Sequence, residues 1–283
     1  MVNQVGSLIG PALGGFAIAF FTAPGTLLIN VIFFFIAALL YMLIPEEVYH
    51  RDMERVAQEK VEMNIKEKWK KFIHETMIGI KFIVSYRILI VIACITLFFN
   101  FAYAPLESAF PVFVDRILRA GPEVLGIMWS IFAVGSLTGS VLWTKLSIKI
   151  SYSYSLGSVI ILWGLIPLLL SITVEVKFVY LLMLLGGVVY APYNIVAPTI
   201  RQKLVPNKIR GRVFGVYGLI SGIGFPIGVY LGGLLTEQLG VLVTVSGSGI
   251  LTIIVGIFVL FSKSLRFNDT EQLAINNEDV PDS

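Results

Sequence analysis

The chain has 283 residues, of which 57% are hydrophobic and 14% are charged, and its formal net charge is +3. Soluble domains usually carry charge on about 25% of their residues, so this composition excludes a soluble protein with a charged shell. One cysteine, Cys94, and two histidines without metal-ligand spacing, His50 and His74, exclude a disulfide framework and argue against a metal site. No nucleophile–base pair or phosphate loop is present, so we expect no enzyme, no cofactor and no nucleic-acid partner.

Apolar stretches long enough to cross a lipid bilayer, which takes about 20 residues, recur eight times along the chain. They predict an all-α membrane protein with eight transmembrane helices, at about residues 1–21, 24–44, 88–113, 123–145, 153–173, 178–199, 211–236 and 241–262. The chain then divides into a two-helix part at 1–44, a polar linker at 45–87, a six-helix part at 88–263 and a tail at 264–283. The tail is polar and acidic, and we expect it to be disordered.

The positive charges predict the orientation in the membrane. All but three of the 21 lysines and arginines lie on one side of the predicted helices: in the linker, in 200–212, and after the fourth and last helices. The positive-inside rule places this side in the cytoplasm. We therefore expect a multi-pass protein of the cell membrane with both termini in the cytoplasm.

The first and seventh apolar stretches share the pattern G-x3-G-x3-G-G, offset by 218 residues. The matching glycines are Gly6, Gly10, Gly14 and Gly15 in the first copy and Gly224, Gly228, Gly232 and Gly233 in the second. Glycines at this spacing share one helix face and let a neighbouring backbone approach closely. A proline accompanies each copy, Pro11 and Pro226, and it frees a backbone carbonyl and permits a bend.

Within the linker, "IKEKWKKFIHETMIGIKFIV" predicts an amphipathic helix with a basic face. Its apolar side chains recur at helical spacing at Ile65, Trp69, Phe72, Ile73, Met77 and Ile80. Two placements of this helix are equally compatible with the sequence. The helix lies on the inner membrane surface, or it packs on cytoplasmic turns of the same protein.

Two motifs carry a resemblance to a known family. "GSLIGPALGG" (residues 6–15) resembles the fifth-helix signature of antiporters of the major facilitator superfamily, G-x8-G-x3-G-P-x2-G-G. "LVPNKIRGRVFG" (residues 204–215) is similar to the loop between helices ten and eleven of the macrolide-efflux-like branch. The resemblance covers residues 1 to about 265. It implies a transporter of 12 helices in two repeats, of which this chain holds helices 5–12 and begins at the fifth.

The resemblance supports two expectations about function. The first is a secondary transporter in the lipid bilayer that exports small hydrophobic or drug-like compounds by alternating access, driven by a proton gradient. The alternative is a truncated or split-gene fragment of such a transporter that does not transport alone. In that case a partner chain would supply the four missing helices.

Candidate residues of the substrate and ion pathway lie on two predicted helices that line the central cavity in the resembled family. Asn100, Tyr103 and Glu107 follow at i, i+3 and i+7, and Tyr190, Tyr193 and Asn194 lie near two prolines, Pro192 and Pro198, that are expected to open their helix. Glu107 either carries a proton at membrane depth or is solvated at the outer interface near Asp115 and Arg116. A cytoplasmic basic loop is expected to hold Arg201, Lys203, Lys208, Arg210 and Arg212.

Overall fold

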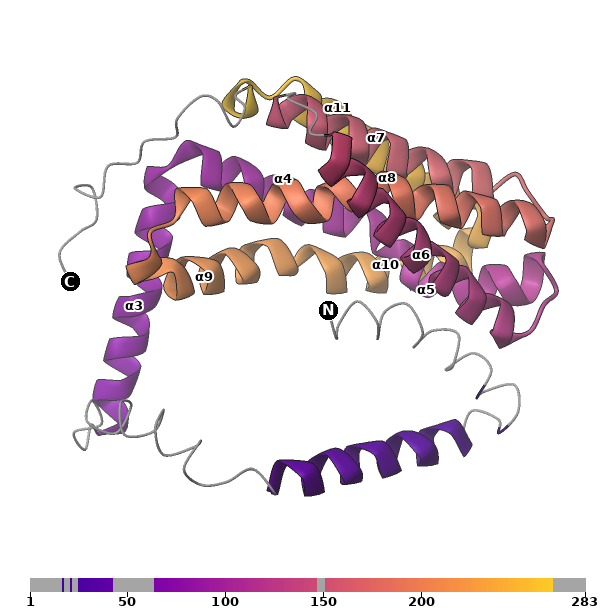
Figure 1. The fold of residues 1–283 in the computed structure, drawn as a ribbon, viewed down its shortest axis with the longest axis horizontal. Helices are drawn as coiled ribbons and strands as arrows, with labels where there is room; N and C mark the ends of the chain where they lie inside the picture. Colours follow the sequence, from indigo (N-terminus) through magenta and orange to yellow (C-terminus); the bar gives the residue numbers. More distant parts are fainter. Residues whose placement is uncertain (1–16, 18–20, 22–24, 43–63, 147–150, 267–283) are drawn as a thin grey trace.

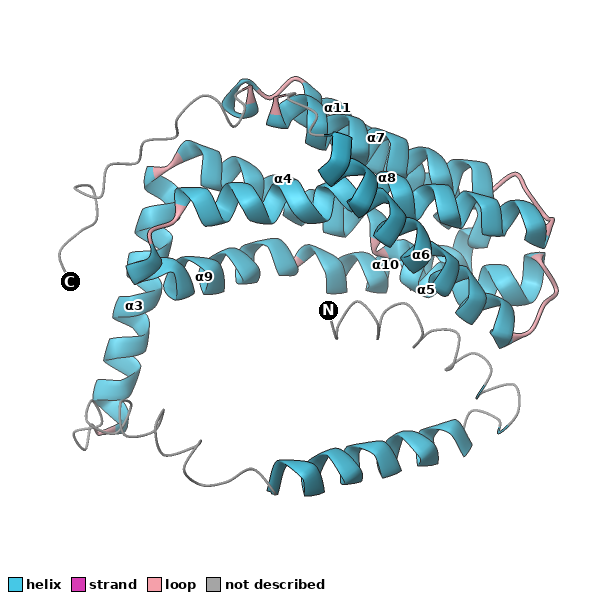
Figure 2. Ribbon diagram, viewed as in Figure 1, coloured by secondary structure: helices cyan, strands magenta, loops and turns pink. Residues whose placement is uncertain are grey.

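The computed structural model describes residues 17, 21, 25–42, 64–146 and 151–266 (Figure 1). Every described element is a helix (Figure 2). Seven of these described segments are long and apolar enough to cross a membrane: Gly25–Met42, Arg87–Ile117, Pro122–Trp143, Tyr152–Leu170, Val176–Leu204, Asn207–Leu239 and Val241–Leu260. The prediction of an all-α membrane protein is thereby confirmed. The expected first helix lies outside the described residues, together with Gly6, Gly10, Pro11, Gly14 and Gly15.

Beyond Gly25–Met42, the described chain forms the helices α3 to α11 and three short turns, η1 to η3. Their bounds are α3 Ile65–Ser85, α4 Arg87–Tyr103, α5 Pro105–Val112, η1 Phe113–Ile117, α6 Pro122–Leu146, α7 Tyr152–Leu170, α8 Val176–Leu204, η2 Asn207–Ile209, α9 Arg210–Gly222, α10 Gly224–Leu239, α11 Val241–Leu260 and η3 Lys263–Leu265. The helix at Gly25–Met42 lies apart from the others, and none of its residues is buried (Figure 1).

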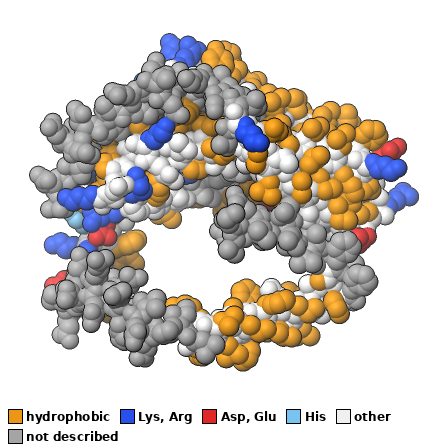
Figure 3. All heavy atoms as spheres, in the orientation of Figure 1, with side chains coloured by type: hydrophobic (Ala, Val, Ile, Leu, Met, Phe, Trp, Pro, Cys, Tyr) orange, Lys and Arg blue, Asp and Glu red, His pale blue; other side chains and the backbone are white. Residues whose placement is uncertain are grey.

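The helices from α4 to α11 form one bundle. α8 packs against α6 and α7, α7 packs against α11, and α4 and α5 lie against α9, α10 and α11. The interior is filled by large apolar side chains that are fully buried, including Phe99, Phe110, Phe113, Met128, Ile160, Leu170, Met183 and Ile200. Hydrophobic side chains also cover much of the outer face in Figure 3, which is the surface expected where the solvent is lipid.

Glycines allow the tightest helix pairs of the bundle to approach. A Cβ atom added to Gly249 of α11 would lie 2.7 Å from the carbonyl oxygen of Gly164 in α7, and one added to Gly164 would lie 2.8 Å from that of Gly249. In lipid, helices associate through such close packing because burial from water supplies no driving force. The small residues therefore determine which helices become neighbours.

One end of the bundle, hereafter the basic end, is formed by α3, the start of α4, the end of α8 and the start of α9. The connection between α8 and α9 is shorter than the sequence suggested, because α8 continues to Leu204 and α9 begins at Arg210. Of the expected loop residues, Arg201 and Lys203 lie in the last turn of α8, Lys208 lies in η2, and Arg210 and Arg212 begin α9. Cations at the end of a helix are favoured by its dipole, which makes the helical position of Arg201 and Lys203 stable.

Candidate functional site

Two of the membrane crossings are each made of two helices, joined by one residue whose φ and ψ angles remain helical. The crossing Arg87–Ile117 is interrupted at Ala104, between α4 and α5, and the crossing Asn207–Leu239 is interrupted at Ile223, between α9 and α10. A proline follows each break, Pro105 at the first position of α5 and Pro226 at the third position of α10. Because proline has no N–H, the carbonyls of Phe101 and Gly222, four residues earlier, lose their helical donors.

The two breaks lie side by side and are joined by polar side chains. The amide nitrogen Nδ2 of Asn100 in α4 donates a hydrogen bond of 2.9 Å to the carbonyl oxygen of Ser221, next to the break in α9. The hydroxyl of Ser248 in α11 donates a 2.6 Å hydrogen bond to the carbonyl oxygen of Ala102, beside the break in α4. These bonds reach the carbonyls of Ser221 and Ala102, which neighbour the carbonyls of Gly222 and Phe101 that the prolines deprive of a donor.

The second copy of the glycine pattern brings α10 against this region. A Cβ atom added to Gly228 would lie 2.6 Å from the carbonyl oxygen of Phe101, and one added to Gly232 would lie 2.8 Å from Oγ of Ser108 in α5. Gly224 meets the backbone of Leu97 in the same way. Gly233 differs, because nothing lies within 4 Å of a Cβ added there. Three of the four glycines thus form the contact with α4 and α5, while Pro226 is exposed.

An aromatic cluster lies at the centre of the bundle, around Tyr190 of α8. The ring centroid of Tyr190 lies 6.1 Å from Phe99 of α4, 5.8 Å from Phe132 of α6, 5.5 Å from Trp163 of α7 and 5.7 Å from Tyr193 of its own helix. Four helices therefore contribute rings to one cluster. Phe99, Trp163 and Tyr193 are buried core residues, so only the half-buried rings of Tyr190 and Phe132 offer surface on which a planar or cationic hydrophobic molecule can stack.

Tyr103 extends the cluster towards the helix breaks. Its ring lies 5.5 Å from Phe99 and 5.8 Å from Phe225 of α10. Glu107 follows one turn later, in the first turn of α5, and its side chain is exposed on the bundle. Asn100 and Tyr103 lie in α4 and Glu107 lies in α5, and the residue between these helices, Ala104, keeps helical φ and ψ angles of −56° and −30°.

Glu107 lies nearer to the second end of its crossing than to the first. The crossing ends at Ile117, ten residues later, which is about 15 Å at 1.5 Å per residue. Asp115 and Arg116 lie in η1, the last turn of the crossing, and so are roughly two turns farther along. The two expected positions of Glu107, at membrane depth and at the outer interface, both stay predictions.

A chain of hydroxyls lies on the side of the cluster nearer the basic end. Tyr193 donates a hydrogen bond of 3.2 Å to Oγ1 of Thr96, and Thr96 and Tyr217 share one of 2.6 Å. The hydroxyl of Tyr217 also donates to the carbonyl oxygen of Ile92, at 3.3 Å. Side chains from α8, α4 and α9 are thus linked inside an apolar core, where unpaired hydroxyls would be costly.

Arg201 is the charged residue nearest to this chain of hydroxyls. Its guanidinium lies over the ring of Tyr217, 4.2 Å from the centroid, and 6.0 Å from the ring of Phe214. Its Nε atom is buried and, within the described part of the chain, has no hydrogen-bond partner. Arg201 thus holds a cation–π contact between α8 and α9 instead of the loop position that the sequence suggested.

Two further cations of the basic end stabilise helix ends and helix contacts. Arg210 donates from Nη2 to the carbonyl oxygens of Gln202, at 3.0 Å, and Val205, at 3.2 Å, and so caps the end of α8. Arg212 forms an ion pair of 3.3 Å with Glu75 of α3. Lys203 and Lys208 are exposed.

The remaining predicted site residues differ in their surroundings. Tyr193 is buried and Tyr190 is half-buried, whereas Asn194, one turn after Tyr190, is exposed. Pro192 and Pro198 lie inside α8, which runs without interruption through both. Helix α8 is therefore continuous at both prolines, and the expected exposure of carbonyls to a cavity stays a prediction. Among the described residues, no group of three or more histidine, cysteine or acidic side chains could hold a metal ion.

Sequence reasoning missed Thr96, Tyr217, Phe99, Phe132 and Trp163. The first two are separated by 121 positions and come together only through packing of α4 on α9. A lone hydroxyl in the apolar stretch "ILIVIACITLFF" was the available signal, because a hydroxyl in a membrane helix requires a partner.

Comparisons with known proteins show the family of the chain. A family model described as transmembrane secretion effector matches residues 2–282. The multidrug efflux pump Tap of Mycolicibacterium fortuitum is 25% identical over 267 residues, which cover 94% of this chain and 62% of that protein. Tap of Mycobacterium tuberculosis is 26% identical over 192 residues, 66% of this chain and 45% of that protein.

A third relative is an uncharacterized MFS-type transporter of Bacillus subtilis, YfiS, which is 24% identical over 278 residues. These residues cover 94% of this chain and 62% of YfiS. The chain thus spans less than two thirds of the length of the curated relatives it matches. No solved structure matches it.

Proposed function

Because the chain belongs to the transmembrane secretion effector family of the major facilitator superfamily, we propose that it acts in the export of small hydrophobic compounds by alternating access. The observation that carries this proposal is the aromatic cluster around Tyr190, which adjoins the two interrupted membrane crossings. Two relatives are named multidrug efflux pumps, which supports export as the direction and drug-like molecules as the substrate class. An ion gradient supplies the driving force.

The basic end faces the cytoplasm in this proposal, and the protein resides in the cell membrane. The positive-inside rule supports this orientation, because Arg201, Lys203, Lys208, Arg210 and Arg212 all lie at that end. The end of the crossing at Ile117 then faces outward. Glu107 lies on the outward side of the aromatic cluster.

The paired breaks are the hinges of the conformational change. A continuous helix resists bending because every backbone hydrogen bond opposes it, whereas Pro105 and Pro226 have each removed one such bond. The Asn100–Ser221 hydrogen bond ties one break to the other, so α4 and α9 bend together. Gly228 and Gly232 present no side chain to α4 and α5, and this smooth contact permits sliding of one helix on the other.

Substrate binds against the exposed parts of Tyr103 and Tyr190. Their rings supply stacking and cation–π contacts, and their hydroxyls supply the polar contact, since no hydrogen bond is found for either hydroxyl within the described part of the chain. Glu107, one turn beyond Tyr103, exchanges a proton with the outside as the transporter changes state. Ionisable side chains at membrane depth commonly serve as such proton relays.

Ligand binding to the purified full chain in detergent tests the aromatic cluster. Trp163 lies 5.5 Å from Tyr190, so a hydrophobic dye cation that binds there quenches tryptophan fluorescence. Tyr190→Ala removes a stacking partner worth about 1 kcal/mol and weakens binding about fivefold. Tyr230→Ala is the matched control, because Tyr230 is 67% exposed on α10 and its loss leaves affinity unchanged. Equal affinities of the two variants would contradict the site.

The proton role is tested by export of the same dye from vesicles with an imposed pH gradient. Glu107→Gln keeps the size and polarity of the side chain but removes its titratable proton. We expect the variant to bind dye normally and to lose the acceleration of export by the gradient. Export that responds to the gradient as before would exclude Glu107 from proton coupling.

A further inference from the structure

α3 lies across the basic end of the bundle, transverse to the crossings formed by α4 and α9 (Figure 1). Its second half is held in place by packing on α9: a Cβ added to Gly79 would lie 2.8 Å from the carbonyl oxygen of Arg212. Glu75 adds the ion pair with Arg212, and Phe82 and Ile83 are buried. Because the crossings run along the membrane normal, α3 runs close to the membrane plane.

A continuous apolar stripe on α3 remains uncovered. At 3.6 residues per turn its side chains fall on one side of the helix, beside the side that packs on α9. The stripe consists of Ile65, Trp69, Phe72, Ile73, Met77, Ile80 and Val84, with exposed fractions of 71%, 61%, 59%, 57%, 45%, 37% and 62%. Water would disfavour this surface, so something apolar covers it.

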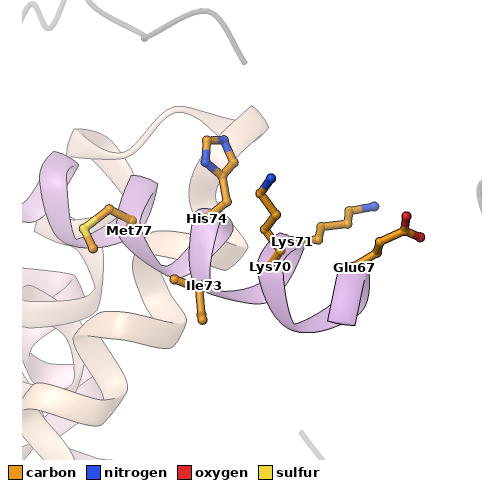
Figure 4. A pocket seen from close by; sticks show the side chains of 6 residues that line it. All are labelled: Glu67, Lys70, Lys71, Ile73, His74 and Met77. Atoms are coloured by element: carbon orange, nitrogen blue, oxygen red, sulfur yellow. The ribbon is translucent and has the colours of Figure 1, made fainter. Parts of the chain in front are cut away.

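Basic side chains border the stripe. Lys66, Lys70 and Lys81 follow it along the edge away from the bundle, by the same helical spacing. Figure 4 shows Lys70 and His74 pointing to one side of the helix and Ile73 to the other. Basic and histidine side chains also gather at this end of the molecule in Figure 3.

The acidic side chains of α3 are engaged within the protein. The carboxylate of Glu67 accepts a 3.1 Å hydrogen bond from the backbone N–H of Asn64, at the start of the helix. Glu75 is paired with Arg212. α3 carries five lysines against these two glutamates, so its charge is net positive and an anionic surface complements it.

We propose that α3 is an interfacial helix that binds anionic phospholipids. Its stripe lies among the acyl chains just below the headgroups, and Lys66, Lys70 and Lys81 contact lipid phosphates. Interfacial helices have an apolar stripe, a basic edge and an orientation in the membrane plane. Tryptophan, present here as Trp69, is enriched at the membrane–water interface. The inference requires only that the chain spans a membrane and is independent of transport.

Spin labels on the full chain in phospholipid vesicles test where the stripe lies. In a Cys94→Ser background, nitroxides are attached at Trp69→Cys, at Ile73→Cys and, as the control on the opposite side of α3, at Lys71→Cys. We expect collisions with oxygen to exceed collisions with a water-soluble nickel chelate at positions 69 and 73, and the reverse at 71. Low accessibility to both reagents at 69 and 73 would mean that protein covers the stripe, and dominant collisions with nickel would mean that water does. Either result overturns the proposal.

The lipid charge is tested by adding phosphatidylglycerol to phosphatidylcholine vesicles. The label at position 73 should move deeper in the anionic vesicles. The variant Lys66→Gln/Lys70→Gln/Lys81→Gln should lose this shift. The matched variant Lys208→Gln/Lys263→Gln/Arg266→Gln, which removes three exposed cations at the same end but outside α3, should keep it. A shift that persists in the α3 variant, or that is absent from the unchanged protein, would refute anionic lipid as the ligand.

Discussion

Substitution of Gly228 by alanine tests whether close packing of α10 on α4 stabilises the bundle. The added methyl group would lie 2.6 Å from the carbonyl oxygen of Phe101 and 2.8 Å from Cβ of Ala104, and neither atom can rotate away. Overpacking of this kind costs about 1–3 kcal/mol, whereas alanine in a helix gains about 1 kcal/mol over glycine. The net expectation is a loss of about 1 kcal/mol.

Gly233→Ala is the matched control, because no atom lies within 4 Å of the added methyl group. This variant should gain the full helix preference of about 1 kcal/mol, so that the two variants differ by about 2 kcal/mol. At about 2–4 °C per kcal/mol for a protein of this size, their melting temperatures in detergent should differ by roughly 4–8 °C. Thermal unfolding followed by tryptophan fluorescence measures this difference. A Gly228→Ala protein that melts at or above the Gly233→Ala protein would refute the packing argument.

Two further substitutions address polar contacts. Asn100→Leu removes the 2.9 Å hydrogen bond to the carbonyl oxygen of Ser221, so the melting temperature should fall by about 2 °C, since such bonds are worth about 0.6 kcal/mol in membrane proteins. An unchanged melting temperature would mean that this carbonyl has another donor. Glu75→Gln and Arg212→Gln should each have a small effect, and their double-mutant cycle should give a coupling below about 1 kcal/mol, because the paired side chains are 35% and 32% exposed. A coupling above about 2 kcal/mol would show a stronger contact than this exposure allows.

The positions of the crossings were predictable from sequence because a bilayer demands apolar length. The expected helix at 153–173 is α7, Tyr152–Leu170, and the expected helix at 241–262 is α11, Val241–Leu260. The required apolar length is a local property of the chain. No tertiary contact was needed to recognise it.

The helix breaks were not predictable in the same way. Pro192 and Pro198 do not interrupt α8, whereas Pro105, which attracted no attention in the sequence, begins a new helix. The difference lies in the neighbours. Near Pro105, Ser248 of α11 donates to the carbonyl of Ala102, and Asn100 of α4 donates to the carbonyl of Ser221 in α9. Such contacts between helices cannot be recognised from the sequence of one helix alone.

The candidate site was predicted only in part. Tyr190 and Tyr193 do reach the aromatic cluster, but the exposed position of Asn194 follows from how α8 is rotated against α4 and α7. That rotation depends on contacts between distant parts of the chain. The partners of Thr96, one on α8 and one on α9, depend on the same contacts.

Thr96 is the middle member of the hydroxyl chain. Thr96 accepts a hydrogen bond from Tyr193 and shares a second one with Tyr217, whereas Tyr193 takes part in only the first of these two bonds. The members are therefore unequal although they form one chain. Replacing Tyr193 by phenylalanine removes only the first donor and leaves every later bond intact. Replacing Thr96 by valine removes both of its hydrogen bonds and leaves the Tyr193 proton without an acceptor. Of the three side chains, the smallest is therefore the one whose loss destabilises the bundle most.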